Sequence, residues 1–307
     1  MKYTPNPSSV VDEMLQTIGC SSLDDLFADI HEELKVKDRL NLSSGMGEME
    51  VRNQLKYLAG CNIDTENYPC FLGAGAYDHY IPAALEQLLL RSEFYTAYTP
   101  YQPEISQGIL QSIFEYQTMI CKLTGLDVSN ASMYDGGSSL AEACSLACAN
   151  SKNKNKVVIS DTVHPEHLDI LKAYALSGHM EIVVVPGQDG HSDIDAMVKA
   201  IDNETACAVI QQPNFYGILE DPTAVEKAIH ENKGMFIMSV EPLSLALLKS
   251  PAEWGADIAV GEGQSLGINL SFGGPYLGFM AANKALMRKI PGRIVGQTTD
   301  LDGKRAF

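Results

Sequence analysis

Five short runs of apolar residues, rich in valine and isoleucine, recur along the second half of the chain. They span residues 157–160, 181–185, 207–211, 235–240 and 258–260. None alternates cleanly between apolar and polar positions, which is typical of strands buried on both faces of a parallel sheet. Helical patterns lie between them, over residues 164–176, 194–201 and 223–230. This alternation predicts a doubly wound α/β domain with right-handed crossovers.

The first third of the chain has a different pattern, which predicts helices and loops. Apolar residues at helical spacing predict helices over 10–18, 23–27, 82–91 and 104–123, and residues 62–80 have a loop-like composition. We therefore expect a helical N-terminal segment over residues 1–70 and an α/β large domain over residues 71–290. Residues 291–307 are expected to be a tail or the start of a missing small C-terminal domain.

Charge and cysteine usage exclude several classes of protein. The chain has 307 residues and a formal net charge of −17. An acidic surface repels phosphate backbones, so we expect no nucleic-acid binding. No charged leader precedes an apolar run and no apolar stretch is long enough to span a membrane, which indicates a cytoplasmic protein. The seven cysteines form no Cys-x-x-Cys pair, so we expect reduced thiols and no metal site.

Two glycines and two serines, from Gly136 to Ser139, open an alanine-rich helix. Unpaired backbone N–H groups and the helix dipole at such an end favour an anion, commonly a phosphate. The same residues fit an ordinary helix start in which Ser139 and Glu142 form a capping box. The residues alone favour plain capping and leave anion binding open.

A segment dense in tyrosine, threonine and proline spans residues 95–108, and its prolines exclude a continuous helix. Tyrosines form rigid amphipathic platforms whose hydroxyl groups hydrogen-bond, so such segments are favoured at interfaces and ligand sites. A surface loop that packs on its own domain is an equally good interpretation.

His164 follows the predicted strand at 157–160. Ligands of open α/β sheets bind beyond the C-terminal ends of the strands, so His164 is placed to stack on a flat ring or to move a proton. The alternative, which the residues alone favour, is a histidine that caps or packs at the start of a helix.

Residues 261–276 contain five glycines, which predicts unusual backbone angles and close approach to a cofactor or a neighbouring subunit. A purely structural turn is the alternative. None of these segments supplies a nucleophile–base pair, a metal-ligand spacing or a dinucleotide fingerprint. The residues alone therefore indicate an α/β protein with one or two glycine-rich ligand loops.

Several ordered segments resemble a known family. They span residues 77–82, 93–108, 114–118, 123–128, 130–136, 263–267 and 272–275. Together they closely resemble the N-terminal half of glycine decarboxylase, the P-protein of the glycine cleavage system, and the resemblance covers nearly the whole chain. It implies the fold of type I pyridoxal phosphate (PLP) enzymes, with a mostly parallel seven-stranded sheet.

The same resemblance implies an activity and its partners. In many bacteria the enzyme is split into an α chain like this one and a β chain, assembled as α2β2. The β chain carries the lysine that holds PLP, glycine is decarboxylated, and the aminomethyl group passes to the lipoyl group of H-protein. Family α chains continue beyond this length, so we expect the small C-terminal domain to be missing from this chain.

The lysine that a PLP enzyme needs is absent from its expected place. Ser265 stands about where that lysine would be, and no lysine falls between Lys249 and Lys284. We therefore expect the chain alone to be catalytically inactive and to hold no covalent cofactor. The residues of a vestigial cofactor or anion pocket would be Gly136, Gly137, Ser138, Ser139, His164, Gln264 and Ser265.

The tyrosine-rich segment is the candidate contribution to the partner's active site. The residues expected to reach it are Tyr95, Tyr98, Tyr101, Gln102 and Glu104. Two alternatives remain: a non-catalytic scaffold or regulatory subunit, and a self-sufficient type I PLP enzyme that uses Lys249.

Overall fold

The computed structural model describes residues 6–38, 40–64, 67–69, 71, 73–95, 98–271 and 273–307. The chain divides into two compact units, Met1–Cys70 and Phe71–Phe307. The expected loop over residues 62–80 lies partly outside the described residues, as do Thr96 and Ala97 of the tyrosine-rich segment and Phe272 of the glycine-rich one.

The first unit is helical. It contains α1 (Ser8–Ile18), the 3-10 helices η1 (Leu23–Phe27) and η2 (Glu32–Leu34), and α2 (Glu48–Gly60), which confirms the helices expected at 10–18 and 23–27. Leu15 is the one buried apolar side chain among the described residues of this unit. Short helices owe most of their stability to packing, and this unit has almost no core of its own.

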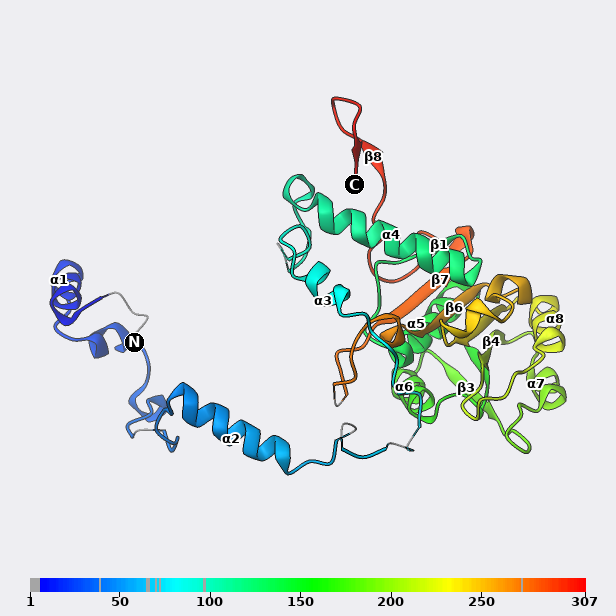
Figure 1. Ribbon diagram of the computed structural model, residues 1–307, viewed down its shortest axis with the longest axis horizontal. Coiled ribbons are helices and arrows are strands. Elements are labelled where there is room, and N and C mark those ends of the chain that lie inside the picture. The colour runs from blue at the N-terminus through cyan, green and yellow to red at the C-terminus, as the bar shows by residue number, and fades with distance from the viewer. Residues whose placement is uncertain are drawn as a thin grey trace. The chain divides into compact units, whose positions relative to one another are not determined.

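The second unit is built on a seven-stranded sheet, which Figure 1 shows with its flanking helices. Its strands are β1 (Val128–Ser129), β2 (Lys156–Ser160), β3 (Glu181–Val185), β4 (Thr205–Gln212), β5 (Met235–Val240), β6 (Ile258–Glu262) and β7 (Gly278–Ala282), in the order β1-β7-β6-β5-β4-β2-β3. Strand β7 is antiparallel to both of its neighbours, and the remaining pairs are parallel. The five expected strands and the mostly parallel sheet are confirmed.

Helices cover both faces of the sheet and explain why the strands lack a polar side. Helices α5 (Gly136–Asn150) and α6 (Pro165–Ala175) pack on one face, where Val157 and Ile159 of β2 join a buried cluster. Helices α4 (Gln107–Thr124), α7 (Ile194–Ala200) and α8 (Thr223–Glu231) pack on the other, where Val158 of the same strand is buried. Alternate residues of one strand therefore enter two cores, both apolar.

The helix expected over residues 104–123 is in fact two elements. A 3-10 turn, η3 (Pro103–Ile105), precedes α4, and Gly125 ends α4 with a positive φ of 73°, which a glycine adopts without steric cost. The helix expected at 82–91 is the shorter α3 (Ala84–Leu89). Among the described helices, none is long and apolar enough to cross a membrane.

The last residues form a two-stranded hairpin, β8 (Thr298–Thr299) and β9 (Arg305–Ala306). Its end lies on α4, because the side chain of Gln107 exchanges two hydrogen bonds of 2.8 and 2.9 Å with the main chain of Phe307. The ring of Phe307 also lies 5.3 Å from that of Phe114. The start of α4, where the tyrosine-rich segment ends, is thus held in place by the hairpin.

Candidate functional site

The predicted pocket residues gather at the edge of the sheet where β2 and β6 end and α5 begins. A chain of direct contacts connects them through Glu262 and His167. Glu262 accepts hydrogen bonds from the backbone of Gly136 and Gln264, and the ring of His167 stacks on that of His164. This is the edge at which open α/β sheets bind ligands.

Helix α5 is capped by Asp135 and not by Ser139. The Asp135 carboxylate accepts hydrogen bonds from the backbone N–H of Ser138 at 2.7 Å and from its hydroxyl group at 3.1 Å. Ser139 lies inside the first turn, where its hydroxyl donates to the Asp135 carbonyl at 2.7 Å. The expected Ser139–Glu142 capping box is therefore wrong, because an aspartate, itself a strong N-cap, starts the helix four residues earlier.

Glu262, the last residue of β6, pairs with the first turn of α5 as well. Its Oε2 accepts the backbone N–H of Gly136 at 2.9 Å. Its Oε1 accepts the backbone N–H groups of Gln264 at 3.0 Å and of Leu277 at 2.9 Å. One carboxylate thus joins three segments of the chain, and a negative charge lies at the positive end of the α5 dipole.

Gly136 and Gly137 allow close packing of α5. A Cβ atom on Gly136 would lie 3.1 Å from both the Glu262 Cβ and the His167 Cε1, and one on Gly137 would lie 2.5 Å from the Ile170 Cδ1. Both glycines are buried. The space beside the first turn of α5 is therefore filled by side chains of β6 and α6.

His164 begins α6 and has partners for both ring nitrogens. Its Nδ1 accepts the backbone N–H of Glu166 at 3.2 Å, so Nε2 carries the hydrogen and donates it to the Ala74 carbonyl at 2.8 Å. The expectation of a capping histidine is confirmed. Its ring lies 4.6 Å from that of His167 with an interplanar angle of 21°, so one face is covered by the protein itself.

His167 is a partly buried neighbour that sequence reasoning missed. Burial, followed by the proximity of His164, lowers the pKa of His167 to about 4, so the ring is neutral near pH 7. Within the described part of the chain its Nδ1 has no hydrogen-bond partner. The sequence feature that could have indicated His167 is its position three residues after His164. This spacing places both rings on one face at the start of a helix.

Ser265 and Gln264 follow Glu262 in a short 3-10 turn, η6 (Gln264–Leu266). The Ser265 hydroxyl donates to the Glu241 Oε1 at 3.2 Å. Gln264 is 5% exposed, and its side-chain amide donates to the Ile268 carbonyl. The turn after β6 therefore presents a hydroxyl group and a buried amide and carries no amine.

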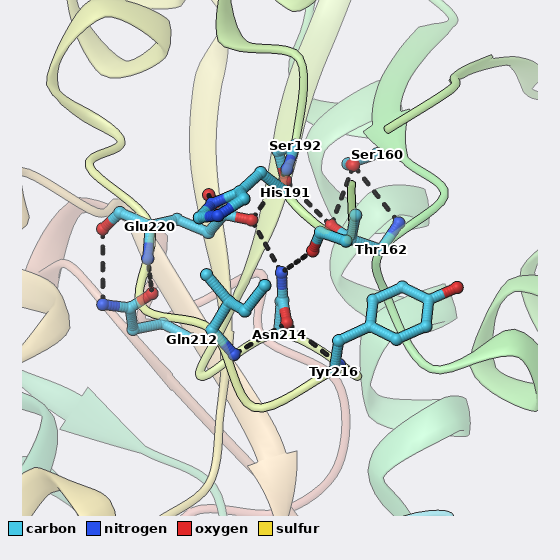
Figure 2. A network of polar contacts seen from close by, with 10 residues as sticks. Ser160, Thr162, His191, Ser192, Gln212, Asn214, Tyr216 and Glu220 are labelled. Atoms are coloured by element: carbon cyan, nitrogen blue, oxygen red, sulfur yellow. Dashed lines mark hydrogen bonds and ion pairs between the residues drawn. The ribbon is translucent and has the colours of Figure 1, made fainter. Parts of the chain in front are cut away.

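A second polar network at the ends of β2 and β4 was also missed from the sequence, and Figure 2 shows it. Glu220 is buried and its Oε1 accepts from the Ser192 backbone at 2.8 Å and from the Asn214 side chain at 2.7 Å. The Glu220 backbone N–H donates to the Gln212 Oε1 at 2.8 Å. These bonds fix the loop after β4 to the loop before α7, which is a structural role.

The tyrosine-rich segment has the opposite character. The side chains of Tyr95, Tyr98, Tyr101, Gln102 and Glu104 are all exposed, and that of Tyr98 is fully so. Among the described residues no hydrogen bond connects them to the Glu262 cluster. The structure therefore brings Gly136, His164, Gln264 and Ser265 together, without a hydrogen bond from the tyrosines among the described residues.

The two ends of this segment are nevertheless held firmly. A Cβ atom on Gly108 would lie 2.8 Å from the Glu93 carbonyl oxygen, so the last residue of the segment packs tightly against the chain just before it. The Gln107 side chain donates to the Pro103 carbonyl at 2.9 Å. The guanidinium of Arg293 lies 4.7 Å from the centre of the Tyr101 ring, a cation–π contact that orients this ring.

Known proteins are similar to the whole chain. The sequence model of the glycine cleavage system P-protein family matches residues 1–307. A protein of Syntrophomonas wolfei subsp. wolfei, named probable glycine dehydrogenase (decarboxylating) subunit 1, is 62% identical over 307 residues, which are the full chain and 70% of the relative. A protein of the same name from Carboxydothermus hydrogenoformans is 55% identical over the full chain and 69% of its own length.

A solved structure agrees with these relatives. The crystal structure of glycine decarboxylase (P-protein) of the glycine cleavage system, in inhibitor-bound form, superimposes with a TM-score of 0.90 at 42% identity. It covers 100% of this chain, and the chain covers 68% of it. The seven-stranded sheet and its helices are thus those of a solved P-protein.

Proposed function

Because the chain belongs to the glycine cleavage system P-protein family, we propose that it serves as subunit 1 of a decarboxylating glycine dehydrogenase. In the proposed reaction glycine loses its carboxyl group as CO2, and the aminomethyl group passes to the lipoyl group of H-protein. The observation that carries the proposal is 62% identity over 307 residues to a relative named as that subunit.

The residues of this chain do not fit PLP, the cofactor that the fold implies. Ser265 offers a hydroxyl group where a Schiff base needs an amine. The Gly136 N–H at the start of α5, where a phosphate group would be bound, is already paired with the Glu262 carboxylate. We therefore assign PLP to a lysine-bearing β subunit, with which this chain forms an α2β2 assembly. The relatives' printed name, subunit 1, supports the existence of a further subunit.

The contribution of this chain to the reaction lies in the segment 95–108. Its exposed side chains Tyr95, Tyr98, Tyr101, Gln102 and Glu104 complete the partner's active site in this proposal. Aromatic side chains that are exposed in one subunit are enriched at subunit interfaces. The firm attachment of both ends of the segment supports a role in positioning groups on another protein.

The test is glycine–bicarbonate exchange by the co-purified α and β subunits, with H-protein present. Tyr98→Ala is expected to lower the exchange rate by about tenfold or more, because misplacement of a positioning group by ~1 Å costs up to ~100-fold. Tyr98→Phe removes the hydroxyl group and keeps the ring, so it distinguishes the contributions of the two. Tyr216→Ala is the matched control, since Tyr216 is another exposed tyrosine of the second unit, and it should change the rate less than about twofold.

Two different failures would be distinguishable. If the wild-type pair shows no exchange, the subunit assignment is wrong. If the pair is active, co-elutes on size exclusion and keeps its full rate with Tyr98→Ala, the chain is a scaffold or regulatory subunit and the role of the tyrosine-rich segment is refuted.

A further inference from the structure

We propose that Glu262 excludes the phosphate group of PLP from this chain, because its carboxylate is itself the anion bound at the start of α5. This exclusion acts within the chain and does not depend on the proposed glycine chemistry. It is also separate from the absence of a lysine at Ser265, since a cofactor can dock through its phosphate without a covalent bond.

The geometry of the carboxylate carries the inference. Glu262 accepts hydrogen bonds from three backbone N–H groups, which belong to Gly136 at 2.9 Å, Gln264 at 3.0 Å and Leu277 at 2.9 Å. One of these donors lies at the N-terminus of α5 and the other two lie beside β6 and β7. Backbone N–H groups that converge on one anion are the groups that hold phosphate oxygens in other proteins. In this chain the three N–H groups already donate to the two carboxylate oxygens of Glu262.

Charge near the site opposes a second anion. The Asp135 carboxylate takes the next donor of the same turn, the Ser138 N–H, at 2.7 Å. Burial raises the pKa of the Tyr116 phenol, and the charge of Glu262 raises it further, so this ring stays neutral. The sequence contains no lysine or arginine from residue 250 to residue 283. An incoming phosphate would therefore meet two carboxylates without a cation from that segment to offset them.

Space beside the donors is also occupied. The Cβ of Glu262 and the ring of His167 both lie 3.1 Å from where a Cβ on Gly136 would be. The Glu262 side chain would have to leave its three donors before a phosphate group could reach them. Removal of this one side chain should consequently both free the donors and open the space, and so create a phosphate site that the native chain lacks.

The first test measures the thermal unfolding of the chain against inorganic phosphate, with sodium chloride of equal ionic strength as the reference. The wild-type midpoint should not respond to phosphate. Glu262→Ala should lower the midpoint, and phosphate should restore it in a saturable manner, since a ligand that binds only the folded state stabilises it by mass action. Glu262→Gln keeps the volume of the side chain and one acceptor oxygen. This variant should fold, and phosphate should raise its midpoint less than that of Glu262→Ala.

The matched control is Glu220→Ala. Glu220 is also a carboxylate that accepts a backbone N–H, from Ser192 at 2.8 Å, but its partners do not lie at the start of α5. This variant should lose stability without any recovery in phosphate. Recovery of both variants to the same extent, or a saturable phosphate response in the wild type, would overturn the proposal.

The second test compares PLP with pyridoxal, which lacks the phosphate group. Ser265→Lys supplies the missing amine, and borohydride reduction with peptide mapping measures capture on the introduced lysine. Pyridoxal closes to an internal hemiacetal and PLP cannot, so the measured quantity is the ratio of PLP capture to pyridoxal capture. With Glu262 intact, this ratio should match that of free lysine under the same conditions. In the double variant Ser265→Lys/Glu262→Ala, the ratio should rise by about tenfold or more, as expected for charge-assisted hydrogen bonds to phosphate. Equal preference in both variants would refute the role of Glu262.

Discussion

The start of α5 and the segment 95–108 differ in the direction in which their polar groups point. At the start of α5, each carboxylate oxygen of Glu262 accepts from the chain's own backbone, and Gln264 is 5% exposed. In the other region Tyr98 is fully exposed, and Gln102 and Glu104 are exposed beside it. The polar groups of the first, closed region bind each other, and those of the second, open region are exposed to solvent.

Under the proposed function, this difference separates the part of the chain that only stabilises it from the part that acts on a partner subunit. A site that has lost its cofactor can be filled by its own side chains, and it then contributes to stability alone. A surface segment that completes another protein's site must keep its side chains free while its ends are fixed. The contacts of Gln107 and Gly108 meet the second requirement in the segment 95–108. Substitutions in the closed region should therefore affect unfolding, and those in the open region should affect the assembled enzyme.

The largest effect is expected from Gly278→Ala in the closed region. A Cβ atom on Gly278 would lie 2.3 Å from both the Asp135 carbonyl oxygen and the Ser139 Oγ, so β7 and the start of α5 would be forced apart. Overpacking of this kind lowers the free energy of unfolding by about 3 kcal/mol. Gly296→Ala is the control, since nothing lies within 4 Å of its added atom. Urea denaturation of both variants measures the difference, and equal stabilities would contradict the close packing.

The next effect is a dependence of stability on pH through His167. The pKa of His167 is about 4 in the folded chain and ~6.5 when unfolded. Because the folded pKa is lowered, the unfolded state binds the proton first, so stability is fully present above pH ~6.5 and is lost as the pH falls toward 4. The loss should reach about 2 kcal/mol near pH 5.

Unfolding curves of the wild type and of His167→Phe, which keeps a ring against His164, isolate this contribution. The difference in unfolding free energy between them should change between pH 7 and pH 5. If it stays constant over that range, His167 is not the buried neutral histidine that the closed region requires.

The smallest effect separates two glutamines. The side chain of Gln264 is buried and donates to the Ile268 carbonyl, so Gln264→Ala should lower the unfolding free energy by about 1 kcal/mol. Gln102 is exposed, so Gln102→Ala should change it by less than about 0.5 kcal/mol. In glycine–bicarbonate exchange the order should reverse, with Gln102→Ala showing the larger loss. If Gln264→Ala caused the larger loss in both unfolding free energy and exchange rate, the distinction between the two regions would be refuted.

The sheet could be predicted from the sequence where both faces of a strand are apolar. Strands β2 to β6 are runs of this kind, and alternate residues enter the two cores. Strand β7, with the sequence Gly-Phe-Met-Ala-Ala, was missed because glycine and alanine are depleted in strands. Its glycine is needed instead for the close approach of Asp135, a contact across about 140 residues that no local pattern indicates.

The site was predicted in part for a similar reason. His164 was predicted as a site residue because it follows a predicted strand. Ser265 was predicted from the resemblance to the glycine decarboxylase family. Glu262 was missed because its donors come from Gly136, Gln264 and Leu277, two of them distant in the sequence. The capping box at Ser139 was wrong because Asp135 competes for the same role. Positions next to a predicted strand could thus be predicted, whereas contacts that the fold assembles between distant segments could not. Competition between neighbouring capping residues misled the one local prediction at Ser139.

In the proposed assembly, this chain shapes a reaction whose cofactor another subunit holds. The most direct test is borohydride reduction of the reconstituted α and β complex in the presence of PLP, followed by peptide mapping of both chains. The account predicts that the reduced cofactor is attached to a lysine of the β subunit alone. Stoichiometric attachment to this chain, in complexes that are active in glycine–bicarbonate exchange, would contradict it.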